Sequence, residues 1–410
     1  MEIKKWLGLR NVTSDERLTT LTKKDHKSSF METADNVDID DTGKVMTRLK
    51  ATLAQAGSYH SLWSDGDVAL VMSGKTLYRM NPDISLTALT TVSSDRRMSY
   101  ARQQNITLLS NGIDKLRLHL DVPLMWGTPQ ARQPTAALTS GGLPAGTYQY
   151  ALTHLRGDGM ESGTGTAGSI ELPVPGGIEF ANIEASIDPE VTDKLIYLSA
   201  PDGSELFRAF AMPAAATTAA YRGSVPELTL RLETQFASPP PAGDIVALYN
   251  ACAYVAVGNM VFYSDPYALE RFKMRTQFLQ FTGEVTMLAP VNDGIYVSTI
   301  DRTWFLQGRH PSEFKSFEVL DYGAIAGTAA RTTVEALRGS PDPAGRRVVV
   351  WTTPSGICLG GDGGVVVNLT ERNFSFPSAQ RGAGIVRQAR GITQYLAALE
   401  GSGVAHNSYS

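Results

Sequence analysis

The sequence has few cysteines, no long hydrophobic run and no excess of charge of one sign. Its two cysteines, Cys252 and Cys358, are too few for a disulfide framework and lack the Cys-x-x-Cys spacing of zinc or iron–sulfur sites. No stretch of about 18 apolar residues is present, so we expect no membrane insertion by this chain. The 37 basic residues are matched by 41 acidic ones, which excludes the strong basic footprint of a dedicated nucleic-acid-binding protein.

The patterns that the sequence does contain are typical of an all-β protein. Short runs of alternating apolar and polar residues are bounded by Gly, Asn, Asp and Pro, which is the signature of strands and turns. Turn signals between such runs predict β-hairpins. They occur at Ser73–Gly74, Asn111–Gly112, Gly258–Asn259 and Ser355–Gly356.

A shift in composition predicts an inserted domain. Residues 134–242 lie between the stretches TPQARQP and ASPPPAG and hold 5 basic against 12 acidic residues. Their short strand patterns, about seven in number, predict an immunoglobulin-like β-sandwich. The acidity of the chain is therefore concentrated in this insert.

The remaining 301 residues predict a β-propeller of about six blades, at roughly 40 to 50 residues per four-stranded blade. Radial closure is favoured over an open sheet because it leaves no long unpaired edge. We divide the chain into an N-terminal arm (1–33), a first propeller part (34–133), the insert (134–242) and a second propeller part (243–410).

Two motifs resemble binding loops but lack an essential residue. Asp38, Asp40 and Gly43 match the start of a calcium-binding EF-hand loop, yet the twelfth position is Leu49 and not the bidentate glutamate. Gly360–Gly364 is glycine-rich but lacks the Lys-Ser/Thr pair of a phosphate-binding loop. We expect hairpin turns at both places, and neither a metal nor a cofactor.

No catalytic motif is evident in the sequence. The six histidines are scattered without metal-ligand spacing, and no Gly-x-Ser-x-Gly elbow occurs. We therefore expect no enzyme, although two distant carboxylates for glycoside hydrolysis stay open, since such pairs come from separate strands. Four tryptophans lie in strand-like runs and are predicted to be sheet core: Trp63, Trp126, Trp304 and Trp351.

Two further features have a functional and a structural interpretation. Arg156–Asp158 spells an integrin-type tripeptide, but we favour a polar turn over an adhesion module. The cluster of Arg271, Lys273 and Arg275 alternates with apolar residues, which on a strand places three cations on one face. These cations either line a polyanion channel or form a solvated strand face.

Several segments, taken in order, resemble one family: the tail nozzle, tail tubular protein B or packaged-DNA stabilisation proteins of short-tailed bacteriophages. The resemblance covers most of the chain. It is carried by LGLRNVTSDERL and by residues 32–49, 109–118, 145–163, 257–272, 292–311, 321–330 and 350–370.

The resemblance implies a structural protein of the virion, assembled in the bacterial host cytoplasm, without catalysis. It implies a homohexameric ring around the DNA channel that retains the packaged genome and conducts it at ejection. The implied partners are further copies of the chain, the tail adaptor and portal proteins, tail fibres or a spike, and double-stranded DNA in transit. A near-neutral body fits such a conduit, because each phosphate neutralised by Lys or Arg would retard passage.

A different class of function competes with this one. Propellers host many activities, so a carbohydrate-binding or glycan-cleaving β-propeller, acting as a receptor-binding tail protein, is the main alternative. Such a protein would be expected to present exposed Trp or Tyr side chains in a pocket.

Overall fold

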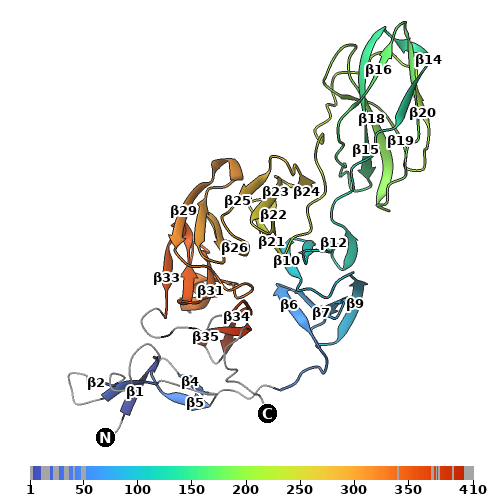
Figure 1. The fold of residues 1–410 in the computed structure, drawn as a ribbon. Coiled ribbons are helices and arrows are strands. Elements are labelled where there is room, and N and C mark those ends of the chain that lie inside the picture. The colour runs from blue at the N-terminus through green and yellow to red at the C-terminus, as the bar shows by residue number, and fades with distance from the viewer. Residues whose placement is uncertain are drawn as a thin grey trace. The chain divides into compact units, whose positions relative to one another are not determined.

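The computed structural model describes most of the chain (Figure 1). The described residues are 3–10, 19–21, 27–31, 37–39, 42–47, 52–338, 341–370, 374, 376, 379–389 and 392–400. They form two compact units. Unit 1 comprises Met1–Ser58, Pro82–Ile84 and Phe281–Ser410, and unit 2 comprises Tyr59–Asn81 and Ser85–Gln280.

Unit 2 begins with two four-stranded antiparallel meanders, in which each strand pairs with the next along the chain. The predicted turns at Ser73–Gly74 and Asn111–Gly112 join strands as expected, and Gly74 supplies the positive φ of 53° that the tight turn requires. Leu70, Leu77 and Leu109 belong to one buried cluster that both meanders share. The strands are β6 (His60–Asp65), β7 (Val68–Ser73), β8 (Thr76–Met80), β9 (Leu86–Thr91), β10 (Ser99–Gln103), β11 (Ile106–Ser110), β12 (Lys115–His119) and β13 (Val122–Met125).

A third meander of unit 2 packs against the second, although the insert separates them in sequence. Trp126 and Phe272 meet edge to face in their shared core, with ring centroids 6.3 Å apart. The Ser110 hydroxyl accepts a hydrogen bond from the Gly243 N–H at 2.9 Å, which ties the two sheets together. The strands are β21 (Ile245–Tyr249), β22 (Cys252–Val257), β23 (Met260–Asp265), β24 (Ala268–Phe272) and β25 (Phe278–Gln280).

The insert contains two antiparallel sheets, drawn in green shades in Figure 1. One has the order β14-β17-β20 and the other the order β16-β15-β18-β19. Tyr148, Phe180 and Ile196 from both sheets form one buried core. The strands are β14 (Thr135–Leu143), β15 (Gly146–Arg156), β16 (Gly168–Leu172), β17 (Gly176–Ala181), β18 (Val191–Leu198), β19 (Phe207–Pro213) and β20 (Ala219–Tyr221).

Unit 1 contains two more four-stranded meanders with a common aromatic core. Tyr296 lies 4.8 Å from Phe305 and 5.6 Å from Trp351, measured between ring centroids. The strands are β26 (Val285–Pro290), β27 (Gly294–Thr299), β28 (Thr303–Gln307), β29 (Lys315–Leu320), β30 (Ala330–Thr333), β31 (Arg347–Thr353), β32 (Gly356–Gly360) and β33 (Val366–Asn368). The helical elements are α1 (Val334–Arg338), η2 (Pro311–Glu313) and η3 (Asp362–Gly364).

Strands from both ends of the chain complete the description of unit 1. Asp38 on β4 and Arg387 on β34 form an ion pair at 3.8 Å. The terminal strands are β1 (Ile3–Leu9), β2 (Thr19–Leu21), β3 (Lys27–Met31), β4 (Val37–Ile39), β5 (Val45–Thr47), β34 (Arg381–Ala389) and β35 (Ile392–Glu400).

The structure confirms an all-β protein with several four-stranded antiparallel sheets. The predicted hairpins at Gly258–Asn259 and Ser355–Gly356 are also confirmed. Within the described residues there are five successive meanders, and closure into a propeller of about six blades stays a prediction, as do the domain limits. No helix in the described part of the chain is long and apolar enough to span a membrane.

Candidate functional site

The predicted basic cluster does not share one strand face. Strand β24 includes Arg271 but ends at Phe272, so Lys273 follows the strand and Arg275 lies in a turn. The Lys273 carbonyl closes that turn by accepting hydrogen bonds from two backbone N–H groups further along. The expectation of three cations on one strand face is therefore wrong, because the chain does not stay extended. A channel-lining role for these three residues remains a prediction, and it no longer has the support of a shared strand face.

The three cations have different surroundings. Lys273 forms an ion pair with Asp265, with 3.6 Å between Nζ and Oδ2. Arg275 is exposed, and Arg271 lines a small pocket at the base of the insert. Of the three, only Arg271 lies beside the group of charged side chains that is described below.

The motifs that resembled binding loops are hairpin turns where the structure describes them. Asp38 lies on β4 and Gly43 in the turn to β5, with a φ of 84°, while Asp40 and Leu49 are outside the described residues. Gly360–Gly364 connects β32 to β33. No group of three or more potential metal-ligating side chains occurs among the residues that the structure describes.

The Arg-Gly-Asp tripeptide is a turn, as predicted, and its charges face the protein. Arg156 ends β15 with a side chain only 1% exposed, and Gly157 and Asp158 form the turn that follows. Asp158 Oδ2 lies 2.8 Å from an Arg117 nitrogen and 3.2 Å from an Arg156 nitrogen. An adhesion receptor could not reach the Arg156 side chain in this conformation.

These ion pairs belong to a largely buried cluster, with Asp158 at its exposed edge, where the insert meets the second and third meanders of unit 2. We call it the junction cluster: Arg117, Arg156, Asp158, Asp188 and Glu270. Arg117 is on β12 and Glu270 on β24, whereas the other three belong to the insert. Arg117 lies 2.8 Å from Asp158 and 3.4 Å from Glu270, so it connects the insert to the third meander.

Charges of opposite sign alternate through the junction cluster. Arg156 pairs with Asp158 on one side and with Asp188, at 3.8 Å, on the other. Thr128, in the linker that leads into the insert, donates a 2.6 Å hydrogen bond to Asp188 Oδ2. Each charge of the cluster therefore has an ion-pair partner, as buried charges require, and the contacts join linker, insert and meanders in one network.

Glu270 is a buried and incompletely paired carboxylate of the junction cluster. Its side chain is 10% exposed, Oε2 lies 3.4 Å from Arg117, and Oε1 has no hydrogen-bond partner. Burial, which disfavours the ionised carboxylate, raises the pKa of Glu270 to about 7. Arg156 and Arg271 act in the opposite direction, while the neighbouring carboxylate of Asp158 adds to the increase.

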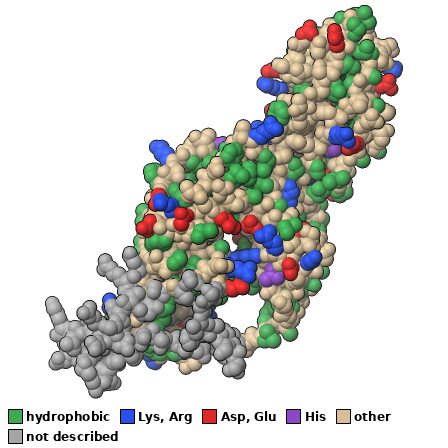
Figure 2. All heavy atoms as spheres, viewed as in Figure 1, with side chains coloured by type: hydrophobic (Ala, Val, Ile, Leu, Met, Phe, Trp, Pro, Cys, Tyr) green, Lys and Arg blue, Asp and Glu red, His purple; other side chains and the backbone are tan. Residues whose placement is uncertain are grey.

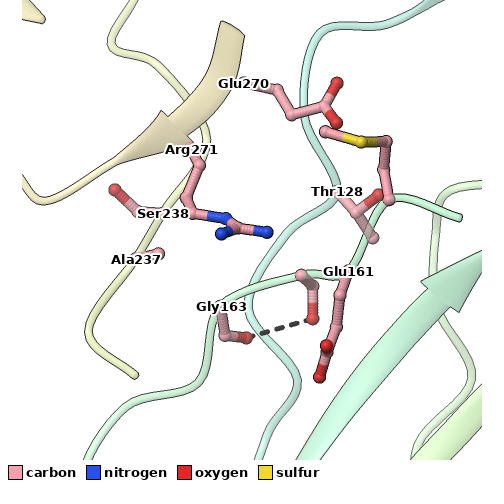
Figure 3. Close-up of a pocket in the computed structure, with 9 residues that line it drawn as sticks. Thr128, Glu161, Gly163, Ala237, Ser238, Glu270 and Arg271 are labelled. Atoms are coloured by element: carbon pink, nitrogen blue, oxygen red, sulfur yellow. Dashed lines mark hydrogen bonds between the residues drawn. The ribbon is translucent and has the colours of Figure 1, made fainter. Parts of the chain in front are cut away.

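A small pocket adjoins the junction cluster (Figure 3). The Arg271 guanidinium extends into the space between Ser238 and Thr128, with Glu270 and Glu161 also on the wall. The cavity volume is about 10 Å³, room for about one water molecule. Its complete lining is Thr128, Met160, Glu161, Ser162, Gly163, Ala237, Ser238, Glu270 and Arg271.

Two more polar side chains are buried at the same end of the sandwich. His154 on β15 faces Lys194 on β18 as a cross-strand pair. Burial, and then the Lys194 charge, lower the pKa of His154. Burial also lowers the pKa of Lys194, whose ammonium donates a 2.8 Å hydrogen bond to the Ala216 carbonyl.

Four tryptophans were predicted to be sheet core. Trp126 and Trp351 are fully buried, which confirms that prediction for both. Trp63 is half-buried and stacks on Tyr100 with 5.3 Å between ring centroids. Trp304 is also half-buried and lies 5.3 Å from the Phe281 ring. All four rings are therefore engaged in packing.

Three members of the junction cluster had no sequence signal of their own. Arg117 stands between two leucines on a short strand, and Glu270 precedes the basic cluster. Asp188 follows an irregular stretch of the insert. The one available signal is the Arg-Gly-Asp turn within the insert, which the sequence indicates only as a polar turn.

Comparison with known proteins assigns no family. No protein-family model and no curated protein matches the chain. Solved structures with similarity over most of it include BBS1N in complex with ARL6DN (8% identity, 85% of this chain and 94% of that chain, TM-score 0.34). Others are BamB from Moraxella catarrhalis (11%, 79% and 77%, 0.30) and the N-terminal domain of Nup159 (10%, 82% and 71%, 0.28). Similarities at these TM-scores assign neither a family nor a function.

Proposed function

We propose that this chain is a structural protein of a short-tailed phage tail, forming a homohexameric ring around the DNA channel. In the virion it would dock on the adaptor and portal proteins and contact tail fibres or a spike. It would retain the packaged genome and conduct it at ejection. The sequence resemblance motivates this proposal, and the features below support it.

The fold proposed for this role is a propeller of about six blades with an immunoglobulin-like insert. Three core clusters each join two meanders that are neighbours once the insert is set aside, which is how propeller blades pack. In the insert, the pairs β14–β17 and β15–β18 join strands three apart in sequence. The B–E and C–F pairs of immunoglobulin-like sandwiches do the same.

The distribution of charge supports a conduit that does not grip DNA. In the insert, Arg156, Lys194 and Asp188 are buried, which leaves three cations against eleven acidic side chains nearer the surface. On the face shown in Figure 2, basic side chains do not form a continuous stripe among the coloured residues. An acidic insert repels the phosphate backbone, so it disfavours tight duplex binding.

The observation that carries the proposal is the junction cluster. A sandwich attached by flexible linkers would suit a mobile domain that binds a distant ligand. Here Arg117 and Glu270 from two meanders meet Arg156 and the partly exposed Asp158 of the insert in one ion-pair network. A clamped accessory domain of this kind suits a rigid subunit of an assembly, whose neighbour contacts must keep one geometry to close a ring.

Assembly of the purified full chain tests the proposal. We expect closed rings in negative-stain micrographs and a hexamer mass by analytical ultracentrifugation, either alone or on an adaptor–portal complex. Arg117→Met, which unclamps the insert, should lower the yield of rings, whereas Arg132→Met, which removes an exposed ion pair between the linker and Glu184 of the insert, should not. A chain that remains monomeric under both conditions would contradict the proposal.

Two binding assays distinguish the proposed DNA conduit from the carbohydrate-binding or glycan-cleaving alternative. Fluorescence anisotropy with duplex DNA at physiological salt should show no sub-micromolar affinity, and such an affinity would refute the conduit. A glycan array and a hydrolysis screen should give no signal. A reproducible glycan hit would favour the carbohydrate-binding or glycan-cleaving propeller instead.

A further inference from the structure

The Glu270 carboxyl is buried between the insert and the third meander without enough partners for its charge. One oxygen lies 3.4 Å from Arg117 and the other has no hydrogen bond. A buried carboxylate that is incompletely paired is costly when ionised, and the cost disappears when the group is neutral. If the insert separates from the meanders, water reaches the same carboxyl and removes the cost.

We propose that the junction between insert and meanders is proton-coupled: it closes over a neutral Glu270 and loosens when Glu270 is ionised. The device is a property of the fold and does not depend on ring formation. The insert is clamped in its main state, and the charge of one side chain sets how often the junction opens.

The charges around Glu270 come from every element packed against it. Arg117 approaches from β12, and Arg271 is its neighbour on β24. From the insert come Arg156 and the carboxylates of Asp158 and Asp188. Glu161 lines the same pocket and accepts hydrogen bonds from Thr153 and Tyr197. Three arginines and three other carboxylates thus surround Glu270, and burial outweighs the attraction of the arginines.

The direction of the pH effect follows from linkage. The pKa of Glu270 is about 7 in the closed junction and about 4.3 for a solvated glutamate. The closed form therefore holds a proton that the open form has lost between these values, so opening becomes more favourable as the pH rises from about 4.3 to about 7 and levels off above that. Between pH 5.5 and 8.5 the opening equilibrium should increase about 30-fold.

Hydrogen exchange of the full chain at pH 5.5 and 8.5 tests this proposal. After correction for the intrinsic exchange rates, amides of residues 157–163 and 235–238 should be about 30-fold less protected at pH 8.5. Amides of the sandwich core on β15 and β18 should show no such change. Equal protection of the junction segments at the two pH values would overturn the proposal.

Variants assign the effect to one carboxyl. Glu270→Gln is a neutral replacement of the same shape, so it should abolish the pH difference and keep the junction closed. Glu161→Gln in the same pocket and the exposed Glu179→Gln should keep the difference. A pH difference that survives in Glu270→Gln, or vanishes in Glu161→Gln, would overturn the proposal.

A second variant covers the case in which Glu270→Gln fails to fold. Arg117→Gln removes the cation at 3.4 Å and leaves Glu270 more poorly paired. We expect a looser junction at both pH values and a steeper pH dependence than in the native chain. An unchanged or absent pH dependence would count against proton coupling.

Discussion

Replacing Asp158 by alanine removes the acceptor that Arg117 and Arg156 share. The two ion pairs measure 2.8 and 3.2 Å, and the arginine side chains are 9% and 1% exposed. Removing one partner of a fully buried pair costs about 3–5 kcal/mol. Because the Asp158 side chain is 41% exposed, water already screens part of this interaction, and we expect roughly 2–3 kcal/mol for the junction.

Native-state hydrogen exchange measures that cost at the place where it arises. A loss of roughly 2–3 kcal/mol corresponds to about 30- to 150-fold faster exchange through local opening. The affected amides should be those of Ser162 and Phe236, whose acceptors are backbone carbonyls that the substitution leaves in place. Glu171→Ala, an exposed acid on β16 of the same insert, is the control and should change exchange less than threefold or so. If Asp158→Ala behaves like this control, the junction cluster does not hold the insert.

Three further predictions address packing and the cysteines. Tyr296→Phe removes a hydroxyl that donates to the Gly361 and Val365 carbonyls in the loop between β32 and β33; the amides of that loop should exchange about fivefold faster, for a loss of about 1 kcal/mol. Gly163→Ala places a Cβ 1.7 Å from a linker carbonyl oxygen, whereas Gly165→Ala meets nothing within 4 Å; only the former should lower the melting temperature, and equal melting temperatures would contradict the packing at the junction. Burial raises the pKa of the Cys252 thiol to about 11, so a thiol reagent at pH 8 should label it only after unfolding, when both cysteines of the chain react.

Hairpins were predictable from the sequence because their causes are local. Ser73–Gly74 and Gly258–Asn259 each place a residue that tolerates positive φ between two alternating runs, and both glycines have φ values near 55°. The strand register then follows from the two-residue turn. Nothing beyond about fifteen residues of sequence is needed for that inference, which is why these predictions were confirmed.

The basic cluster shows where the alternation rule fails. Arg271, Lys273 and Arg275 alternate with apolar residues, but alternation predicts a shared face only while the backbone stays extended. Phe272 fills the core at the end of β24, and the Gln277 side chain then caps the Lys273 N–H at 2.7 Å as the chain turns. A turn without glycine or proline carries little sequence signal, so the end of the strand could not be predicted.

The junction cluster could not be predicted because its partners are far apart in sequence. Arg117 is 41 residues from Asp158 and 153 residues from Glu270. Each alone resembles a solvated charge on a strand or turn, since long charged side chains are seldom buried. Only the packing of the second meander against the third, with the insert between them in sequence, brings these opposite charges together.

The chemistry of the junction cluster also explains why the insert adopts a single orientation on the meanders. An apolar contact of the same size would stabilise the junction as well or better, because the desolvation of paired charges offsets most of their attraction. It would also tolerate rotation and sliding, since apolar contacts are not directional. Arg117 is best paired by a carboxylate at its position, and a displaced insert would carry Asp158 away from it, which leaves Arg117 with only the longer 3.4 Å contact to Glu270. The ion pairs therefore fix the orientation of the insert more than they add stability. Glu270 is incompletely paired, so a change in its charge can weaken that preference for one orientation.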